Sequence, residues 1–326
     1  MAELNHRFIE TNGIRMHIVE CGTGPLVLLC HGFPESWYSW RHQLQALAEA
    51  GFHPVAPDMR GYGQTDRPEA IDQYTLLHLV GDMVGLLDAF GADTAVIAGH
   101  DWGSPVAWYS ALLRPDRFRA VIGLSVPFWP RLPVRPTSLM PQTDEAIFYQ
   151  LYFQAPGVAE AELERDVRRS IRSLLYSASG DAPRRENAGS PGTAVGMVPR
   201  EGSFLSHMMD PVSLPSWLTD ADVNVYVKEF TRTGFSGGLN WYRNIDRSWE
   251  LFAAFADSRV SVPALYIAGD RDLVVAFRGM DQIIASLPYF VPQLRATLML
   301  PGCGHWTQQE RPLEVNNSII NFLQQI

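Results

Sequence analysis

Three short stretches of the sequence carry residue types suited to nucleophilic catalysis. GHDWG places Asp101 between two glycines, directly after the apolar run TAVIAG. AGDRD offers Asp270 and Asp272, and CGHW near the C-terminus holds His305. A nucleophile followed along the chain by an acid and then a histidine is an order in which a carboxylate can orient a histidine base. We therefore expect Asp101 to be the nucleophile, His305 the base, and either Asp270 or Asp272 the orienting acid.

An aspartate at the nucleophile position indicates which kind of atom is attacked. A serine that attacks an sp3 carbon leaves an ether, which water does not readily cleave, whereas a carboxylate leaves an ester, which water can cleave. An aspartate with an ordinary pKa of about 3.9 is ionised at pH 7, so Asp101 needs no base for its attack. His305 would act in a second step, taking a proton from the water that attacks the Asp101 carbonyl. The structural alternative is that Asp101 only caps the following helix.

Backbone N–H groups are expected to stabilise the charge that develops in the second step. HGFPES follows the apolar run PLVLLC, and a turn there would present the N–H of Phe33. The N–H of Trp102, the residue after the nucleophile, would point to the same place and complete an oxyanion hole. The alternative interpretation is that HGFP only ends a strand. His31 and His100 flank this site and are expected to have structural roles in their turns.

The elements that would position these residues alternate between strand and helix. Short apolar runs that lack polar alternation are typical of strands in a parallel sheet covered on both faces. These runs are PLVLLCHG, FHPVAPD, TAVIAGH, AVIGLSVP and VPALYIAGD, and TLML before CGHW predicts a last strand. LLHLVGDMVGLLDAFG predicts a helix that ends at Gly91, and GSPVAWYSALLR predicts a helix with Pro105 in its first turn. The pattern predicts an α/β fold with a doubly wound, mostly parallel sheet.

A different region interrupts this alternation between residues 128 and 256. It contains helical segments and loops but no comparable buried strand, so we expect a helical lid, or cap domain. The lid would be inserted into an α/β core made of residues 1–127 and 257–326. Within it, residues 177–202 are rich in Gly, Pro, Ser and charge and predict a long mobile loop. Lids of this kind exclude water from a reaction site.

Composition limits the partners and the compartment. The 326 residues are 46% hydrophobic and carry a net charge of −9, so they can build a large core and would repel nucleic acid and anionic membrane surfaces. The start, MAELNHRFIE, has no long apolar stretch, so we expect no signal peptide and no membrane anchor, and we predict a cytoplasmic protein. Cys21, Cys30 and Cys303 are widely separated, which favours reduced thiols over disulfides or zinc ligands.

Six ordered segments resemble those of the α/β-hydrolase superfamily and, within it, the soluble-type epoxide hydrolases with their C-terminal hydrolase domain. The segments are HGFPESWYSWR, PDMRGYGQTDRP, GHDWGSPVAW, FYQLYFQAPGVAEAELE, GGLNWYRN and CGHWTQQERP. The resemblance spans nearly the whole chain. It implies an α/β-hydrolase fold with an inserted cap and a hydrolase acting on ether bonds that converts epoxides to vicinal diols.

The resemblance also implies roles for individual residues. Asp101 would form the covalent ester, and His305 with Asp272 would activate the water, because the family's acid is the one followed by an apolar run, here DLVV. Tyr149 in FYQLYF and Tyr242 in NWYRN would be the acids, since phenols stay protonated at neutral pH and can protonate the epoxide oxygen. The expected partner is a small-molecule epoxide, without cofactor or metal, and the protein would be a monomer or homodimer.

Two other functions remain open for the same fold. A haloalkane or haloacid dehalogenase shares the nucleophile, histidine and acid but replaces the two phenols with donors that hold a halide. Tyr149 and Tyr242 argue against a dehalogenase, whereas Trp102 fits either enzyme. A ligand receptor without catalytic activity is the other alternative, and the complete set of catalytic residues argues against it. Release of a diol or of a halide would distinguish the three.

Overall fold

An eight-stranded sheet forms the centre of the protein. The computed structural model describes residues 3–183 and 195–326, and in it the strand order is β1-β2-β4-β3-β5-β6-β9-β10. The strands are β1 (Asn5–Thr11), β2 (Ile14–Glu20), β3 (Leu26–Cys30), β4 (His53–Pro57), β5 (Ala95–His100), β6 (Phe118–Leu124), β9 (Ala264–Gly269) and β10 (Leu294–Leu300). From β4 to β10 the strands are parallel, so the predicted α/β-hydrolase fold and all six predicted strands are confirmed.

The first two strands were not predicted from the sequence. β1 and β2 form an antiparallel hairpin, and β2 pairs antiparallel with β4 at the edge of the parallel part. The turn between them is Asn12–Gly13, and both residues have positive φ, at 45° and 76°. This pair of residues is well suited to a two-residue hairpin turn, because Asn and Gly tolerate the left-handed conformation. β1 itself is mostly exposed and therefore lacks the continuous apolar run of a buried strand.

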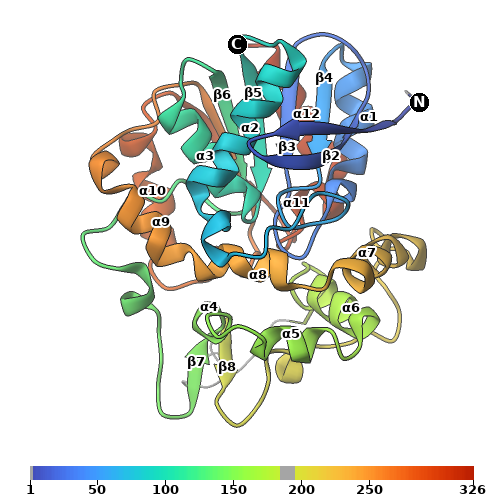
Figure 1. Cartoon of the computed structure of the whole chain (residues 1–326), viewed down its shortest axis with the longest axis vertical. Helices are drawn as coiled ribbons and strands as arrows, with labels where there is room; N and C mark the ends of the chain where they lie inside the picture. The colour runs from blue at the N-terminus through green and yellow to red at the C-terminus, as the bar shows by residue number, and fades with distance from the viewer. Residues whose placement is uncertain (1–2, 184–194) are drawn as a thin grey trace.

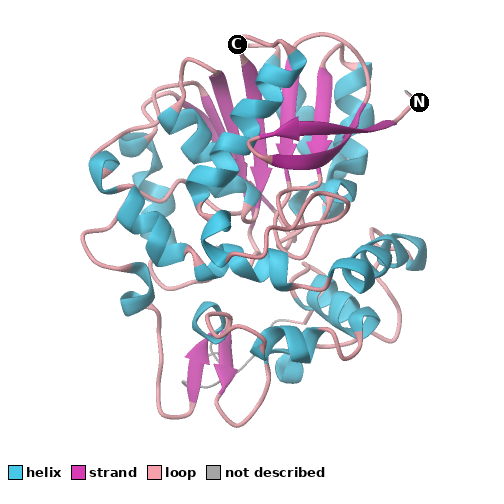
Figure 2. Cartoon of the chain, viewed as in Figure 1, coloured by secondary structure: helices cyan, strands magenta, loops and turns pink. Residues whose placement is uncertain are grey.

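Helices cover both faces of the sheet (Figures 1 and 2). Val27 and Leu29 of β3 pack into a core shared with α1 (Arg41–Glu49) and α12 (Pro312–Leu323). Leu26 and Leu28 point the other way, into a core shared with the remaining helices of the sheet layer, α2 (Leu76–Phe90), α3 (Gly103–Leu113) and α10 (Met280–Phe290). Successive strand residues thus bury opposite faces, which is why the strand sequences are apolar throughout.

The chain leaves the sheet between β6 and β9. This region contains α4 (Tyr149–Tyr152), α5 (Val158–Leu163), α6 (Val167–Ser177), α7 (Asp220–Thr233), α8 (Ser236–Arg243) and α9 (Ile245–Leu251), with short 3₁₀ turns at Pro136–Leu139, Phe204–His207 and Ala253–Phe255. In Figure 1 the carboxyl ends of the parallel strands point toward α8, with α7 beside it and α4 to α6 beyond it. This placement puts the region over the edge of the sheet where the strand-end residues meet.

A small second sheet adds to the helical segments and loops that were expected in residues 128–256, where no buried strand comparable to those of the core was predicted. β7 (Ala146–Phe148) and β8 (Met197–Pro199) pair antiparallel, and each strand is only three residues long. A run of that length carries no periodicity that sequence analysis can detect. β8 also lies within the stretch 177–202 that was predicted to be a mobile loop, and part of that stretch, 184–194, falls outside the described residues.

The structure also shows the state of the cysteines and whether its helices or polar clusters could span a membrane or hold a metal ion. Cys21, Cys30 and Cys303 are buried free thiols, as expected. Across residues 3–183 and 195–326, no helix is both long and apolar enough to cross a membrane. Within the same ranges, no three His, Cys, Asp or Glu side chains are grouped so that they could hold a metal ion.

Candidate active site

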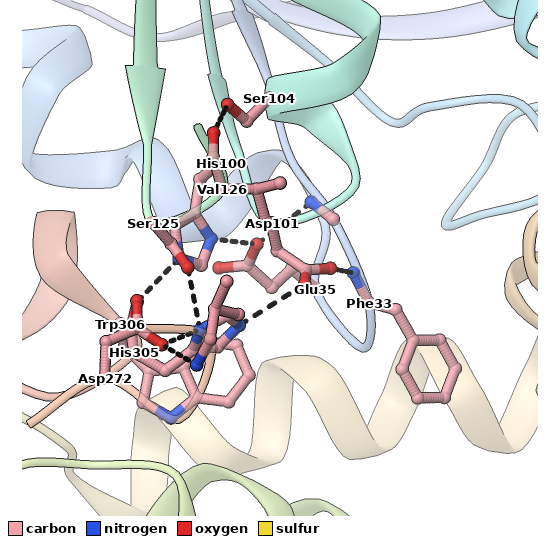
Figure 3. A network of polar contacts seen from close by, with 12 residues as sticks. Phe33, Glu35, His100, Asp101, Ser104, Ser125, Val126, Asp272, His305 and Trp306 are labelled. Carbon is pink, nitrogen blue, oxygen red and sulfur yellow. Dashed lines mark hydrogen bonds and ion pairs between the residues drawn. The ribbon is translucent and has the colours of Figure 1, made fainter. Parts of the chain in front are cut away.

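The sheet brings the candidate residues to one edge. Phe33 follows β3, Asp101 follows β5, Ser125 follows β6, Asp272 follows β9 and His305 follows β10. These strands are parallel, and their carboxyl ends meet at the same edge, which is where open α/β sheets form their sites. Figure 3 shows the side chains of Asp101, Asp272 and His305 converging there.

Asp101 sits on a sharp turn between β5 and α3. Its φ is 51°, a left-handed conformation that costs a non-glycine residue energy and is often found at functional sites. The turn is tight because a Cβ on Gly99 would lie 1.9 Å from the carbonyl oxygen of Gly103, and one on Gly103 would lie 2.1 Å from the carbonyl oxygen of Cys30. α3 has no side-chain cap hydrogen bond, so its geometry gives no support to a role for Asp101 as a helix cap.

The close approach at Gly103 leads to a stability prediction. Gly103→Ala should destabilise the fold by roughly 1–3 kcal/mol or more, because the added methyl group meets rigid backbone that has no room to move. Gly81→Ala is the matched control, since the atoms nearest to its Cβ belong to the side-chain amide of Asn12, which hydrogen-bonds His78 and Asp82 and can shift more easily than backbone. Urea unfolding of both variants checks the prediction, and equal unfolding midpoints would contradict it.

One oxygen of the Asp101 carboxylate accepts a hydrogen bond from a backbone N–H group. The N–H of Phe33 donates to Asp101 Oδ1 over 2.7 Å. Gly32 makes this approach possible, because a Cβ there would lie 2.3 Å from Asp101 Oδ1 and 2.6 Å from the nitrogen of Trp102. The amides of Phe33 and Trp102 therefore lie beside the same carboxylate, as an oxyanion hole requires.

His305 lies between two carboxylates. Its Nε2 is 3.4 Å from Asp101 Oδ2, and its Nδ1 is 2.9 Å from Asp272 Oδ1. Asp272 is completely buried, and its Oδ1 also accepts a hydrogen bond from the N–H of Val274 over 2.9 Å. Asp270 points elsewhere, since its carboxylate accepts from the N–H of Gly302 over 2.8 Å. The geometry thus separates the two aspartates of AGDRD, one beside the histidine and one in a neighbouring turn.

The two carboxylates control the charge of His305. Burial alone would lower the pKa of the imidazole, but the negative charges of Asp272 and Asp101 outweigh it and raise the pKa well above 6.5. Burial would raise the pKa of Asp272, and the facing imidazole lowers it below its usual range instead. In the ligand-free protein these groups favour an imidazolium between two carboxylates.

Two residues near His305, Ser125 and Glu35, were not predicted from the sequence as parts of this site, whereas His31 and His100 were expected to have structural roles in it. Ser125, whose φ is 69°, places its Oγ 3.0 Å from His305 Nδ1. Glu35 lies 2.8 Å from His100 Nδ1, and His100 Nε2 donates to the carbonyl oxygen of His305 over 2.7 Å. His31 has a structural contact, accepting from the N–H of Met59 through its Nε2. A serine or glutamate in a loop carries no pattern of its own, so only the fold reveals these contacts.

Tyr149 and Tyr242 reach the site from α4 and α8. Their ring centroids are 5.9 Å apart, and the ring of Tyr242 packs edge-on against Trp102 at 5.1 Å and Phe33 at 5.6 Å. The amide of Gln150 donates to the hydroxyl oxygen of Tyr149 over 3.0 Å, which leaves the phenol proton of Tyr149 free for another acceptor.

Both phenols are kept protonated by their surroundings. Burial is the main reason that the pKa values of Tyr149 and Tyr242 lie well above the ordinary 10, and the negative charge of Asp101 raises them further. The arrangement therefore combines a carboxylate, two phenol donors and a histidine held by a second carboxylate.

Known proteins share both the fold and the length of this chain. The sequence model of the family described as alpha/beta hydrolase fold matches residues 25–312, so the chain belongs to that family. It is 46% identical over 329 residues to epoxide hydrolase A of Mycobacterium tuberculosis, covering 99% of this chain and 98% of that protein. It is 42% identical to epoxide hydrolase 3 of Siraitia grosvenorii, with 99% of both chains covered. Within the family the chain belongs with the epoxide hydrolases.

A solved structure agrees with the sequence comparison. The structure of an epoxide hydrolase from an endophytic Streptomyces matches with a TM-score of 0.92 and 46% identity, over 98% of this chain and 95% of that one. Similarity at this level extends through the region between β6 and β9 as well as the sheet. The resemblance stated from the six sequence segments is therefore confirmed at the level of the family.

Proposed function

We propose that the protein hydrolyses epoxides to vicinal diols through a covalent ester on Asp101. The observation that carries the proposal is the position of His305, with Nε2 3.4 Å from Asp101 Oδ2 and Nδ1 2.9 Å from Asp272 Oδ1. The ring of Tyr242 packs against Trp102 and Phe33 beside this group, and the ring of Tyr149 packs against Tyr242. Membership among the epoxide hydrolases supports the substrate class. A small-molecule epoxide is the expected partner, with no cofactor.

In the first step Asp101 opens the ring. Asp101 Oδ1 is held by the N–H of Phe33, so Oδ2 is the oxygen that attacks the epoxide carbon. A C–O bond forms at Oδ2 while the ring C–O bond breaks, and the electron pair goes to the epoxide oxygen. Tyr149 or Tyr242 donates its phenol proton to that oxygen. The product is an alkyl ester of Asp101 that carries a free hydroxyl group.

In the second step water cleaves the ester. His305 Nε2 takes a proton from water, and the hydroxide adds to the carbonyl carbon of Asp101. The charge on Oδ1 is then stabilised by the amides of Phe33 and Trp102, and each such donor contributes roughly 2.7–4 kcal/mol in known oxyanion holes. Collapse expels the diol oxygen, which takes the proton from His305 and leaves Asp101 as a carboxylic acid. The proton of this acid passes through solvent to the phenolate left by the first step, so the Asp101 carboxylate and the tyrosine phenol are both regenerated.

Ester formation also changes the charge around His305. The ester is neutral, so the negative charge of Asp101 that helps to raise the pKa of His305 is lost. The pKa of His305 therefore falls when the ester forms, and the imidazole becomes the neutral base that the second step needs. Ester hydrolysis should accordingly rise with pH through this lowered pKa and then level off.

The charge coupling between Asp101 and His305 can be tested without a substrate. Asp101→Asn removes the same charge without a substrate, so the pKa of His305 should be lower in Asp101→Asn than in the wild type. Titration of the His305 ring signals by NMR measures the difference, and rapid-quench decay of the wild-type ester at several pH values gives the kinetic counterpart. An unchanged or higher His305 pKa in the variant would contradict the proposed charge coupling.

The experiment that tests the proposed function is a substrate panel. Aromatic and aliphatic epoxides should yield vicinal diols, and haloalkanes of similar size should release no halide. One turnover in ¹⁸O water should give unlabelled diol, because the oxygen added in the first turnover comes from Asp101. Label in the first diol, or halide release without diol formation, would overturn the proposal.

The organisation of the molecule is also part of the proposal. We propose that residues 128–256 act as a cap on a core made of 1–127 and 257–326, because α4 and α8 carry the two phenols toward Asp101. A cytoplasmic location fits the three free thiols, since the cytosol keeps cysteines reduced. Size-exclusion chromatography with light scattering would distinguish the proposed monomer from the homodimer.

A further inference from the structure

One segment of the proposed cap contacts the loop of the catalytic base, residues 301–306 between β10 and the short helix at Thr307–Glu310, which we call the base loop. We call residues 175–182, the end of α6 and the turn after it, the clasp segment. The backbone N–H of His305 donates to the carbonyl oxygen of Ala178 over 2.9 Å. The indole N–H of Trp306 donates to the carbonyl oxygen of Leu175 over 2.7 Å. Two successive residues of the base loop are therefore fixed to the clasp segment.

The clasp segment also contacts the loop of the orienting acid. Arg271, which precedes Asp272, donates from its Nη2 to the carbonyl oxygen of Ala182 over 2.7 Å. The same eight residues thus touch the neighbours of both members of the His305–Asp272 pair. A shift of the clasp segment would move both loops.

Glu310 joins the clasp segment to the base loop through one carboxylate. Its Oε2 accepts from the N–H of Gly180 over 2.8 Å and from the N–H of Gly304 over 2.8 Å, and its Oε1 accepts from the N–H of Trp306 over 3.0 Å. The side chain is buried, with 5% of the residue exposed. Gly304 and Trp306 are the two neighbours of His305, so the carboxylate holds the backbone on both sides of the base.

The two backbones meet too closely for any side chain between them. A Cβ on Gly180 would lie 2.1 Å from the carbonyl oxygen of Gly302, and a Cβ on Gly304 would lie 2.2 Å from the nitrogen of Gly180. Glycine is needed at both positions because the obstacles are backbone atoms. The clasp segment and the base loop are therefore packed backbone against backbone, which leaves little freedom in their relative position.

We propose that Glu310 is a positioning residue for the base: it fixes the backbone on both sides of His305 by tying it to the clasp segment. The inference rests on the proposed function, in which His305 acts only in ester hydrolysis. Ring opening uses Asp101 and the two phenols, none of which contacts Glu310. A misplaced His305 should therefore slow the second step alone.

Glu310→Gln tests this role. The amide keeps one acceptor oxygen but replaces the other with an NH₂ group, which faces backbone N–H groups that need an acceptor. Errors of about 1 Å in the position of a catalytic group cost on the order of a hundredfold, so ester hydrolysis should slow ten- to a hundredfold, while ring opening stays near the wild-type rate. Rapid-quench mass spectrometry of the Asp101 peptide measures the two rates separately.

Controls separate this inference from the proposed function and from simple loss of folding. Glu314→Gln changes an exposed carboxylate one turn further along, and it should leave both rates unchanged. Gly180→Ala perturbs the junction from the cap side and should slow hydrolysis in the same way. Arg271→Met removes the hydrogen bond between the half-buried Arg271 side chain and Ala182 and should slow hydrolysis about fivefold, the effect of one lost hydrogen bond. If the other variants do not fold, this variant still tests whether the clasp segment positions the His305–Asp272 pair, which is the premise of the role of Glu310.

The outcomes are distinct. If the wild type forms no ester, the proposed function fails. If the wild type forms the ester but the folded variants hydrolyse it at the wild-type rate, only the role of Glu310 fails. Equal slowing of ring opening and hydrolysis would also overturn the inference, because it would mark a general structural defect rather than a displaced base.

Discussion

Asp101→Asn should lose turnover by at least on the order of 10⁴-fold while the protein stays folded. The amide is nearly isosteric with the carboxylate, and its oxygen can still accept from the N–H of Phe33 as Asp101 Oδ1 does. A neutral amide is a poor nucleophile, however, so the ring carbon is not attacked and no ester forms. Diol formation in the steady state and mass spectrometry of the intact protein after substrate addition measure the two losses.

The control for this prediction is Asp270, which follows β9 two residues before Asp272. Asp270→Asn changes an aspartate whose carboxylate holds the Gly302 turn rather than His305, so it should retain most of the activity. Slow deamidation of the introduced asparagine back to aspartate would restore activity with time, and the mass of the peptide at each time point identifies it. A freshly purified, folded Asp101→Asn protein with wild-type activity would contradict the assignment of the nucleophile.

The sharp turn that carries Asp101 and the turn that presents the N–H of Phe33 could be predicted because each depends on residues close together in the sequence. Gly99, Asp101 and Gly103 lie within five residues, and the spacing follows from how a strand turns into a helix. Phe33 was predicted in the same way, from a glycine turn directly after a strand. Local backbone geometry restricts the residue types at these positions, so the pattern is visible without the fold.

Contacts between distant segments could not be predicted in this way. Gly180 and Glu310 are 130 positions apart, and neither residue type is unusual for its surroundings. Ser125 and His305 are 180 positions apart, and the residue pattern after β6 offered only a serine where an acid would have drawn attention. Such contacts are decided by how loops pack at the edge of the sheet, which leaves no periodic trace in either segment.

The lid tyrosines show how a resemblance and the geometry complement each other. Tyrosines in helical segments usually pack, and nothing in FYQLYF distinguishes Tyr149 from Tyr152 by spacing. The structure separates them, because the hydroxyl of Tyr152 donates to Glu162 over 2.8 Å, whereas that of Tyr149 accepts from Gln150. Tyr152 therefore uses its proton within the cap, and the proton of Tyr149 is free for a substrate.

The double variant Tyr149→Phe with Tyr242→Phe should open the epoxide ring at least on the order of a hundredfold more slowly than the wild type. General acid catalysis contributes about 10² to 10⁴-fold, and this variant removes both phenols proposed to donate a proton to the epoxide oxygen. Each single change should cost less, because the remaining phenol is still protonated: burial and Asp101 hold its pKa well above 10. Rapid-quench measurement of ester formation gives these rates directly.

Ester hydrolysis in the same double variant should change much less, because His305 reaches the ester from the strand end of β10 and its polar contacts do not include either phenol. Tyr152→Phe is the matched control from the same helix, and it should open the ring at the wild-type rate, since the hydroxyl of Tyr152 hydrogen-bonds Glu162 instead.

The double variant also distinguishes epoxide opening from halide displacement. A dehalogenase expels a halide that needs no proton, so a double variant that forms the ester as fast as the wild type would reduce both phenols to packing residues. That result would favour halide displacement over epoxide opening at Asp101.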